Sequence, residues 1–196
     1  MKNDRLKSIL GIPYFLFLVI FVVCPVLILL YYAFTNGAGE FSFANFTLFF
    51  TDSKAIGTLI YSAMVAVVTT IVCLLIAYPV AYLLAKGEFR RGNVLLMLFV
   101  MPMWINFTLR ITALKEILTL IEGNLAFHPF LNTVIGMTYD FLPFMILPIY
   151  NTIAKIDHSY IEAAKDLGAK SYRVFLRVIL PLSIPGIISG ITMVFL

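Results

Sequence analysis

Residues 55–85 read AIGTLIYSAMVAVVTTIVCLLIAYPVAYLLA, a run of 31 positions without one charged side chain. A helix needs about 20 apolar residues to cross a hydrocarbon core about 30 Å thick. A helix of the length of this run must tilt within the bilayer or project beyond it. The run therefore predicts a transmembrane helix, and it places the chain among integral membrane proteins.

The composition of the whole chain agrees with this class. Of its 196 residues, 62% are hydrophobic and 12% are charged, whereas about 25% are charged in ordinary soluble domains. The net charge of +4 does not indicate nucleic-acid binding, because the basic residues lie on loops between apolar runs and form no single patch with interleaved aromatic rings. The cysteines and histidines lack the spacing of a zinc or haem site, so we expect no metal and no other cofactor.

Four further apolar runs surround the first. They cover residues 12–34, 92–109, 132–154 and 178–196, and Pro102 interrupts the second of these four. The run at 12–34 has the basic flank of a signal peptide, but its length and the lack of a cleavage site favour an uncleaved first span. The expected fold class is an all-α integral membrane bundle, truncated after its fifth span, whose last apolar run implies at least one more span beyond Leu196.

Lysines and arginines are distributed unevenly between alternate loops. One side carries eleven of them: Lys2, Arg5, Lys7, Lys86, Arg90, Arg91, Lys155, Lys165, Lys170, Arg173 and Arg177. The other side carries three: Lys54, Arg110 and Lys115. Because cytoplasmic loops are enriched in Lys and Arg, we predict that the N-terminal tail, residues 1–11, and the loop at 155–177 lie in the cytoplasm.

The loop at 155–177 is a polar stretch with local helix signals. Ser159 and Glu162 fit a capping box, in which a hydroxyl and a carboxylate satisfy free backbone N–H groups at the start of a helix. Gly168 is well placed to end that helix in the left-handed conformation, and Ser171 can cap a second helix. We expect a rigid helix–turn–helix elbow near the membrane surface.

The elbow contains Glu162-Ala163-Ala164, then Gly168 after three residues, and then VILP at 178–181 after nine more. This spacing resembles the EAA loop of binding-protein-dependent ABC import permeases, whose pattern is EAA, x3, G, x9, I-x-L-P. Val178 stands where the pattern has Ile. The resemblance implies the MetI-like, type I importer permease fold, with a permease core at 55–196 and a cytoplasmic coupling loop at 155–177.

In that family the loop inserts into a groove on the ATPase subunit, and ATP-driven closure of two ATPases moves the permease helices. The resemblance therefore implies a coupling site for an ATPase in this chain, formed by Glu162, Ala163, Ala164, Gly168 and Pro181. Small alanine side chains allow another protein to approach closely, and glycine adopts a conformation that any Cβ would penalise.

The likeness is greatest to the spermidine/putrescine branch of the family. It is carried by DFLPFMILPIY at 140–150, by IEAAKDLGA at 161–169, and by the basic tail and first span at 2–34. It implies uptake of polyamines across the bacterial cytoplasmic membrane, with two ATPase subunits, a sister permease and an extracytoplasmic polyamine-binding protein as partners, all set in membrane lipid. Sulfate, thiamine and iron permeases share much of the pattern, so another small solute remains an alternative.

Four residues are candidates for the substrate path: Asp140, Trp104, Tyr61 and Tyr78. Asp140 is the one carboxylate deep in a predicted span, where an ionised group faces protein or a wet cavity. A polyamine is a polycation, for which carboxylates and aromatic faces are natural contacts. Two of these candidates have a structural alternative, because Asp140 can pair with Arg110 or with a partner subunit and Trp104 can belong to an interfacial aromatic belt.

Two other classes of function compete with the permease. An ion-coupled secondary carrier could use Asp140 as its coupling carboxylate, but it would give the elbow no purpose. An intramembrane enzyme would need a paired acid and base or an activated nucleophile within the spans, and the sequence offers none. We expect no enzymatic activity, since nothing resembles a G-x-x-x-x-G-K-[ST] phosphate loop.

Overall fold

The computed structural model describes residues 12–36, 39–87 and 92–196, apart from the side chain of Asn93. The predicted tail at 1–11 and the basic residues Lys2, Arg5, Lys7, Arg90 and Arg91 lie outside the described residues. Within them the chain is helical, with only an isolated β-bridge between Thr35 and Phe41, which confirms the all-α class. The chain divides into two compact units, Met1–Ile60 and Tyr61–Leu196.

The first unit contains the predicted first span. The span is helical over Ile12–Ala33, 22 residues, and its side chains are largely exposed in the isolated chain. It includes a π-helical stretch, η1 (Val19–Val23), and α2 (Cys24–Ala33). A short helix, α3 (Ala44–Thr51), follows, and the side-chain amide of Asn45 donates to the carbonyls of Tyr32 (3.0 Å) and Thr35 (3.1 Å), which satisfies acceptors at the end of α2.

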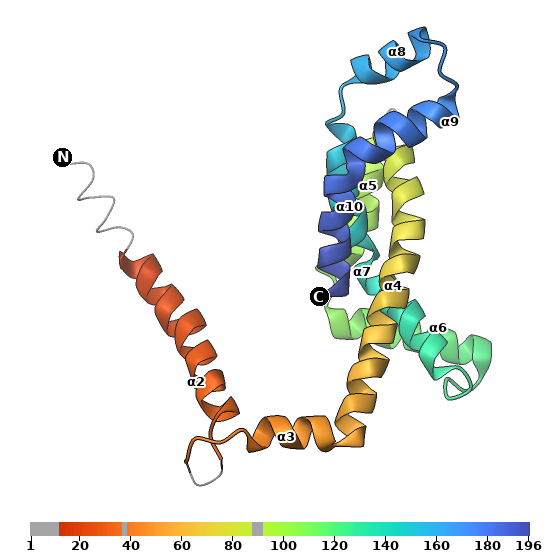
Figure 1. Ribbon diagram of the computed structural model, residues 1–196. Coiled ribbons are helices and arrows are strands. Elements are labelled where there is room, and N and C mark those ends of the chain that lie inside the picture. The colour runs from red at the N-terminus through yellow and green to blue at the C-terminus, as the bar shows by residue number, and fades with distance from the viewer. Residues whose placement is uncertain (1–11, 37–38, 88–91) are drawn as a thin grey trace, which may run out of the picture. The chain divides into compact units, whose positions relative to one another are not determined.

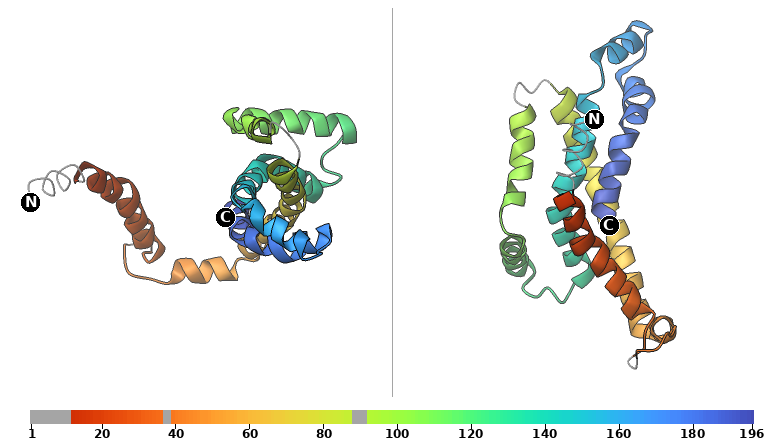
Figure 2. Two further views of the ribbon diagram at one scale, coloured as in Figure 1. Left: turned by 90° about the horizontal axis from the view of Figure 1, so that it is seen from above. Right: turned by 90° about the vertical axis from the view of Figure 1, so that its left-hand side faces the viewer.

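Three long helices form the core of the second unit (Figures 1 and 2). They are α4 (Ser53–Lys86), which belongs to this unit from Tyr61 onward, α7 (Pro129–Ala154) and one continuous helix made of α9 (Ser171–Val174), η3 (Phe175–Ile179) and α10 (Leu180–Phe195). All three are long and apolar enough to cross a membrane, in agreement with the predicted spans. Their buried side chains include Cys73, Ala77, Ala81, Met145, Ile146, Ile149, Ile153 and Ile179.

Two glycines bring α10 close to α7. A Cβ added at Gly186 would lie 2.5 Å from Oγ1 of Thr152 and 2.7 Å from the carbonyl oxygen of Pro148. A Cβ at Gly190 would lie 2.6 Å from the sulfur of Met145. In membranes, where apolar side chains gain little by leaving lipid, helices associate through such close backbone packing of small residues.

Two prolines follow π-helical stretches. Pro25 follows η1, and Pro181 follows η3. Proline donates no N–H, and in an α-helix its ring clashes with the carbonyl four residues earlier, which belongs here to Phe21 and Arg177. Both residues lie inside the π-helical stretches, whose wider turn relieves the clash, so that each helix continues through its proline.

The third predicted span, residues 92–109, is wrong at its end. The helix formed by α5 (Gly92–Val100) and the 3-10 turn η2 (Met101–Trp104) stops before Ile105. Asn106 then caps α6 (Phe107–Glu122), because its side-chain oxygen accepts from the N–H of Thr108 at 2.9 Å. The two helical parts meet at a bend of 97°, so the described chain has four helices that could span a membrane, or five if this bent pair is one span.

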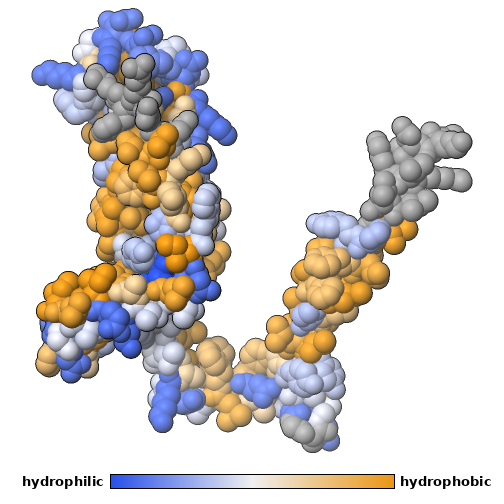
Figure 3. Space-filling model, turned by 180° about the vertical axis from the view of Figure 1, so that it is seen from behind, coloured by the Kyte–Doolittle hydropathy of each residue, from blue (hydrophilic) through white to orange (hydrophobic). Residues whose placement is uncertain are grey.

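The surface of the second unit differs in hydropathy between its body and one of its ends. Apolar side chains cover much of the three-helix core, whereas hydrophilic side chains gather at the end that carries α8 (His158–Asp166) (Figure 3). That end contains the predicted coupling loop.

Candidate coupling and substrate-path sites

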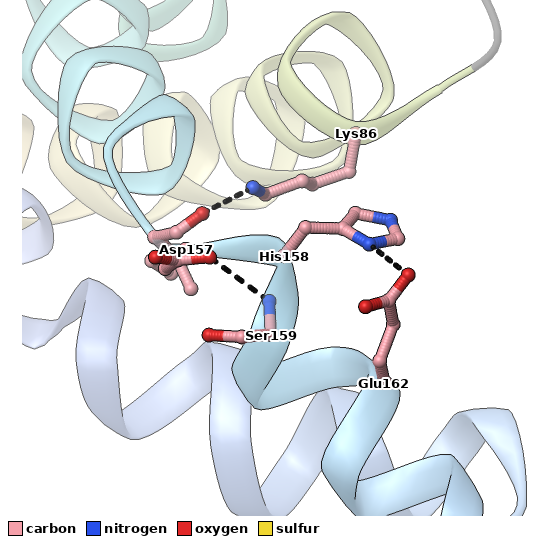
Figure 4. Close-up of polar contacts among 6 residues, drawn as sticks. Lys86, Asp157, His158, Ser159 and Glu162 are labelled. Carbon is pink, nitrogen blue, oxygen red and sulfur yellow. Dashed lines mark hydrogen bonds and ion pairs between the residues drawn. The ribbon is translucent and has the colours of Figure 1, made fainter.

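The helix α8, which carries the predicted coupling residues, begins at His158, with Asp157 as its N-cap. The carboxylate of Asp157 accepts from the backbone N–H of Ser159 at 3.0 Å, and this hydrogen bond holds the pKa of Asp157 below its usual range (Figure 4). The predicted capping box, with Ser159 as N-cap and Glu162 reaching back, is therefore wrong. Asp and Ser are comparable N-cap residues, and it is Asp157 that adopts the extended backbone that a cap requires.

Glu162 points outward from the first turns of α8. Its Oε1 lies 3.0 Å from Nδ1 of His158, one turn earlier, and both side chains are about two-thirds exposed, at 65% and 68%. Ala163 beside it is exposed as well, whereas Ile161 is buried against the core cluster. The helix is thus held by Ile161 and by the partly buried Ala164, and its outer face is left exposed.

Gly168 ends the helix as predicted. Its φ is +79°, in the left-handed region that glycine adopts without penalty. The N–H of Gly168 donates to the carbonyl of Lys165 (2.8 Å), and the N–H of Ala169 donates to the carbonyl of Ala164 (3.0 Å). These two bonds form a Schellman motif, so Ala164 contributes its carbonyl to the turn as well as a small side chain.

The second helix of the elbow begins at Ser171, and the predicted cap by Ser171 is wrong. Lys170 is the N-cap, and its backbone carbonyl accepts from the N–H groups of Arg173 (2.8 Å) and Val174 (3.2 Å) without any side-chain cap. This helix continues into the membrane-spanning segment, where Pro181 lies in the first turn of α10. Pro181 shapes the start of the span, while Glu162 and Ala163 lie on the exposed helix α8.

A contact that sequence reasoning missed ties the segment before α8 to α4. Nζ of Lys86, the last residue of α4, donates to the backbone carbonyl of Ile156 at 2.7 Å (Figure 4). Lys86 had a signal in the sequence, as the first charge after the 31-residue apolar run. Its acceptor is a main-chain group, and no sequence pattern identifies such a partner.

Asp140 forms an ion pair with Arg110. Nη2 of Arg110, on α6, lies 3.1 Å from Oδ1 of Asp140, on α7, and their side chains are only 8% and 3% exposed. Among the described residues, Nε and Nη1 of Arg110 and Oδ2 of Asp140 have no hydrogen-bond partner. The structure thus contains the pairing that the sequence left open as an alternative. Each partner also keeps polar atoms that could form a further hydrogen bond.

The three aromatic candidates lie in different surroundings. Tyr61 lines a cavity of about 290 Å³ together with residues of α7 and α10, whereas the hydroxyl of Tyr78 shares a 3.0 Å hydrogen bond with Ser183. The two tyrosines are 17 residues apart on α4, which corresponds to about 25 Å along a helix. Trp104 is 83% exposed at the end of η2. The structure therefore does not bring the four candidates into one site.

Comparison with known proteins places this chain in a family. A model described as "Binding-protein-dependent transport system inner membrane component" matches residues 77–196. The chain belongs to this family. The match covers the end of α4 and everything after it, including the elbow.

Several curated members of the binding-protein-dependent family are similar over most of this chain. The spermidine/putrescine transport system permease protein PotB of Haemophilus influenzae is 36% identical over 99% of this chain and 74% of its own length. PotB of Escherichia coli K12 is 35% identical over 91% of this chain and 72% of its own length. A PotB homolog of Mycoplasma pneumoniae is 34% identical over 61% of this chain.

Membership of this family, together with the four or five apolar helices, makes the chain a multi-pass inner-membrane protein and the transmembrane permease subunit of an ABC importer. Its place in a transport system of several components follows from the same membership. Among the described residues, no group of three or more His, Cys, Asp and Glu side chains is arranged to hold a metal ion.

Proposed function

We propose that this permease translocates polyamines, spermidine or putrescine, delivered by an extracytoplasmic binding protein. It would act beside a sister permease, with two ATPase subunits that hydrolyse the ATP, so that the chain itself performs no catalysis. The names of the PotB relatives, which match it over most of its length, support the substrate class.

The coupling function is carried by the geometry of α8. The helix is fixed at its start by the Asp157 cap, next to the bond from Lys86 to Ile156, and at its end by the turn at Gly168. Its outer face is free. A rigid element with a free face is what docking against an ATPase requires, because little ordering entropy is lost on binding. We assign the coupling site to Glu162, Ala163, Ala164, Gly168 and Pro181.

The proposed topology puts the tail at 1–11 and the loop at 155–177 in the cytoplasm, with the first span at 12–34 and the permease core at 55–196. We would replace Cys24 and Cys73 by serine and place single cysteines at Ser171 and Glu116, which are both exposed. An impermeant thiol reagent applied to intact cells should label the cysteine at Glu116 and leave the one at Ser171 untouched. Labelling at Ser171 would overturn the topology.

Asp140 is a proposed substrate contact, with Arg110 as the group that a substrate ammonium would replace. The unpartnered Oδ2 of Asp140 supports this proposal, since a carboxylate accepts several hydrogen bonds. Tyr61 offers an aromatic face on a cavity of its own. For Trp104 and Tyr78 the structure favours surface and packing roles, so their part in the path rests on the sequence alone.

The decisive experiment is copurification of the tagged chain from membranes, with identification of every protein that accompanies it and with uptake of labelled spermidine and putrescine. An ATPase with polyamine uptake is the expected result. An ATPase without polyamine uptake would point to another small solute. Uptake driven by an ion gradient, with no ATPase, would replace the importer with a secondary carrier.

A further inference from the structure

A cavity of about 330 Å³ lies inside the elbow, between the end of α8 and the start of the last span. Its walls are formed by Ala164, Leu167, Gly168, Ala169, Arg173, Val174, Arg177 and Val178. Glu162 and Ala163, on the outer face of α8, do not line it. The cavity therefore shares Ala164 and Gly168 with the assigned coupling site, but the outer face of α8 with Glu162 and Ala163 lies outside it.

The cavity has an uncompensated positive charge. Arg173 and Arg177 are four residues apart, so they lie on the same face of the helix. Nε of Arg173 donates to the hydroxyl of Tyr172 at 3.0 Å, which orients the guanidinium. In the part of the chain that the structure describes, neither arginine forms an ion pair with a carboxylate. Two guanidinium groups beside one cavity suit the bidentate binding of a phosphate group.

The cavity also lies where the polar elbow meets an apolar helix long enough to span a membrane. Ser171–Phe195 is apolar enough to span a membrane, and Arg177 lies in its second turn. Leu176 beside it is exposed, and the helix beyond is apolar. Arginines at such a depth extend their charge towards the head groups while their stems stay against apolar surface. A ligand for this place combines an anionic head with apolar chains.

We propose that Arg173 and Arg177 bind the phosphate of an anionic phospholipid in the leaflet next to the elbow. Basic pockets between membrane helices are known places for such head groups. The bound lipid would fill the space under α8 and hold the elbow at a fixed height above the bilayer. This inference goes beyond the proposed function and does not depend on which solute is transported.

The test uses the assembled transporter purified in mild detergent and reconstituted into lipid discs of phosphatidylcholine with or without one-third phosphatidylglycerol. Native mass spectrometry counts the phosphatidylglycerol that stays bound after detergent release. The variants are Arg173→Gln, Arg177→Gln and their combination. Lys155→Gln is the matched control, since it removes one positive charge from the same loop, and Lys155 lies outside the cavity lining.

We expect each arginine substitution to lower the amount of retained phosphatidylglycerol on the order of fivefold. Lys155→Gln should leave this amount unchanged. Phosphatidylcholine should not be retained selectively by the parent protein. ATPase copurification should be unchanged. Retention at the parent level in the double variant would overturn the proposal. Loss of the ATPase with lipid retained would also overturn it and assign the cavity to an acidic side chain of the ATPase. If the double variant does not assemble, the same readings apply to Arg177→Gln alone.

Discussion

The contact between α7 and α10 and the elbow around α8 are held together by opposite means. Between α7 and α10, Gly186 and Gly190 leave less than a methyl group of space, and the neighbours on α7 are backbone and core side chains. In the elbow, an Asp cap, a glycine turn and one lysine-to-carbonyl bond fix the helix, while most side chains are exposed.

The difference shows how one chain can combine a contact that resists deformation with a surface that stays free for docking. Close packing of helices tolerates little change in volume, so the contact of α7 with α10 resists deformation. Hydrogen bonds at helix ends fix an orientation without covering a surface, so the elbow can keep its shape and still present a free face. We expect substitutions in the two regions to separate stability from coupling.

The largest effect should come from breaking the buried Arg110–Asp140 pair, because removing one partner leaves an uncompensated charge at about 3–5 kcal/mol. Arg110→Met and Asp140→Asn should each lower the thermal stability of the purified permease. The double variant should lose clearly less than the sum of the two. Thermal unfolding in detergent measures all three changes.

The same variants distinguish a structural role of Asp140 from a role in transport. If its charge contacts the polyamine, a charge-assisted hydrogen bond of about 1.5–3 kcal/mol is lost in Asp140→Asn, which corresponds to a drop in uptake of roughly ten- to a hundredfold. Uptake is normalised to the amount of assembled complex. Unchanged uptake per complex would leave Asp140 as a purely structural partner of Arg110.

The next effect should be overpacking at Gly186. Gly186→Ala puts a methyl group within 2.5–2.8 Å of Thr152 and Pro148, and overpacking of this kind costs about 1–3 kcal/mol. Gly136→Ala is the matched control, because a Cβ at Gly136 of α7 meets nothing within 4 Å. Equal melting temperatures of the two variants would contradict the close approach of α7 and α10.

In the elbow, Gly168→Val should leave the melting temperature nearly unchanged and impair docking. A β-branched residue at a φ of +79° is strained by about 1–2 kcal/mol, and the local turn can relax where a packed core cannot. The measurement is cross-linking of the ATPase to Ala163→Cys. Gly168→Asn, which tolerates this conformation better, should restore part of the yield, and full yield with valine would refute the role of the turn.

The smallest effect should be an acid-sensitive cap at Asp157. The hydrogen bond from the Ser159 N–H holds its pKa below the ordinary value near 3.9, so the cap contributes stability above that value and loses it as pH falls through the lowered pKa. Hydrogen exchange of α8, corrected for the intrinsic effect of pH, should rise only in this acid range. Asp157→Asn keeps the cap without the titration and should abolish the change.

The bundle was largely predictable from the sequence, because charge-free runs such as 55–85 leave few alternatives to a membrane helix. Gly168 was predictable for a similar reason, since few residues can end a helix in the left-handed region. The predicted end of the third span at residue 109 lies five residues beyond Trp104, where the helix ends, because hydropathy does not register the cap that Asn106 provides.

The details of the elbow were less accessible. Asp157 and Ser159 are both capable N-caps. Which of them starts α8 depends on the backbone conformation between α7 and α8, which the sequence does not give. Arg110 was one of two partners that the sequence left open for Asp140, since no sequence pattern shows that α6 lies beside α7. The pair of glycines at 186 and 190 is visible in the sequence, but the helix that they face is not.

The unbroken course of Ser171–Phe195 means that a movement of the elbow would reach the far end of the last span. These 25 residues form a helix about 37 Å long, with its near end in the elbow. The wide turn of η3 lets the helix pass Pro181 without a break, so a tilt at the elbow would be transmitted along its whole length. A tilt of about 10° at the elbow would swing its far end by about 6 Å for a lever of that length.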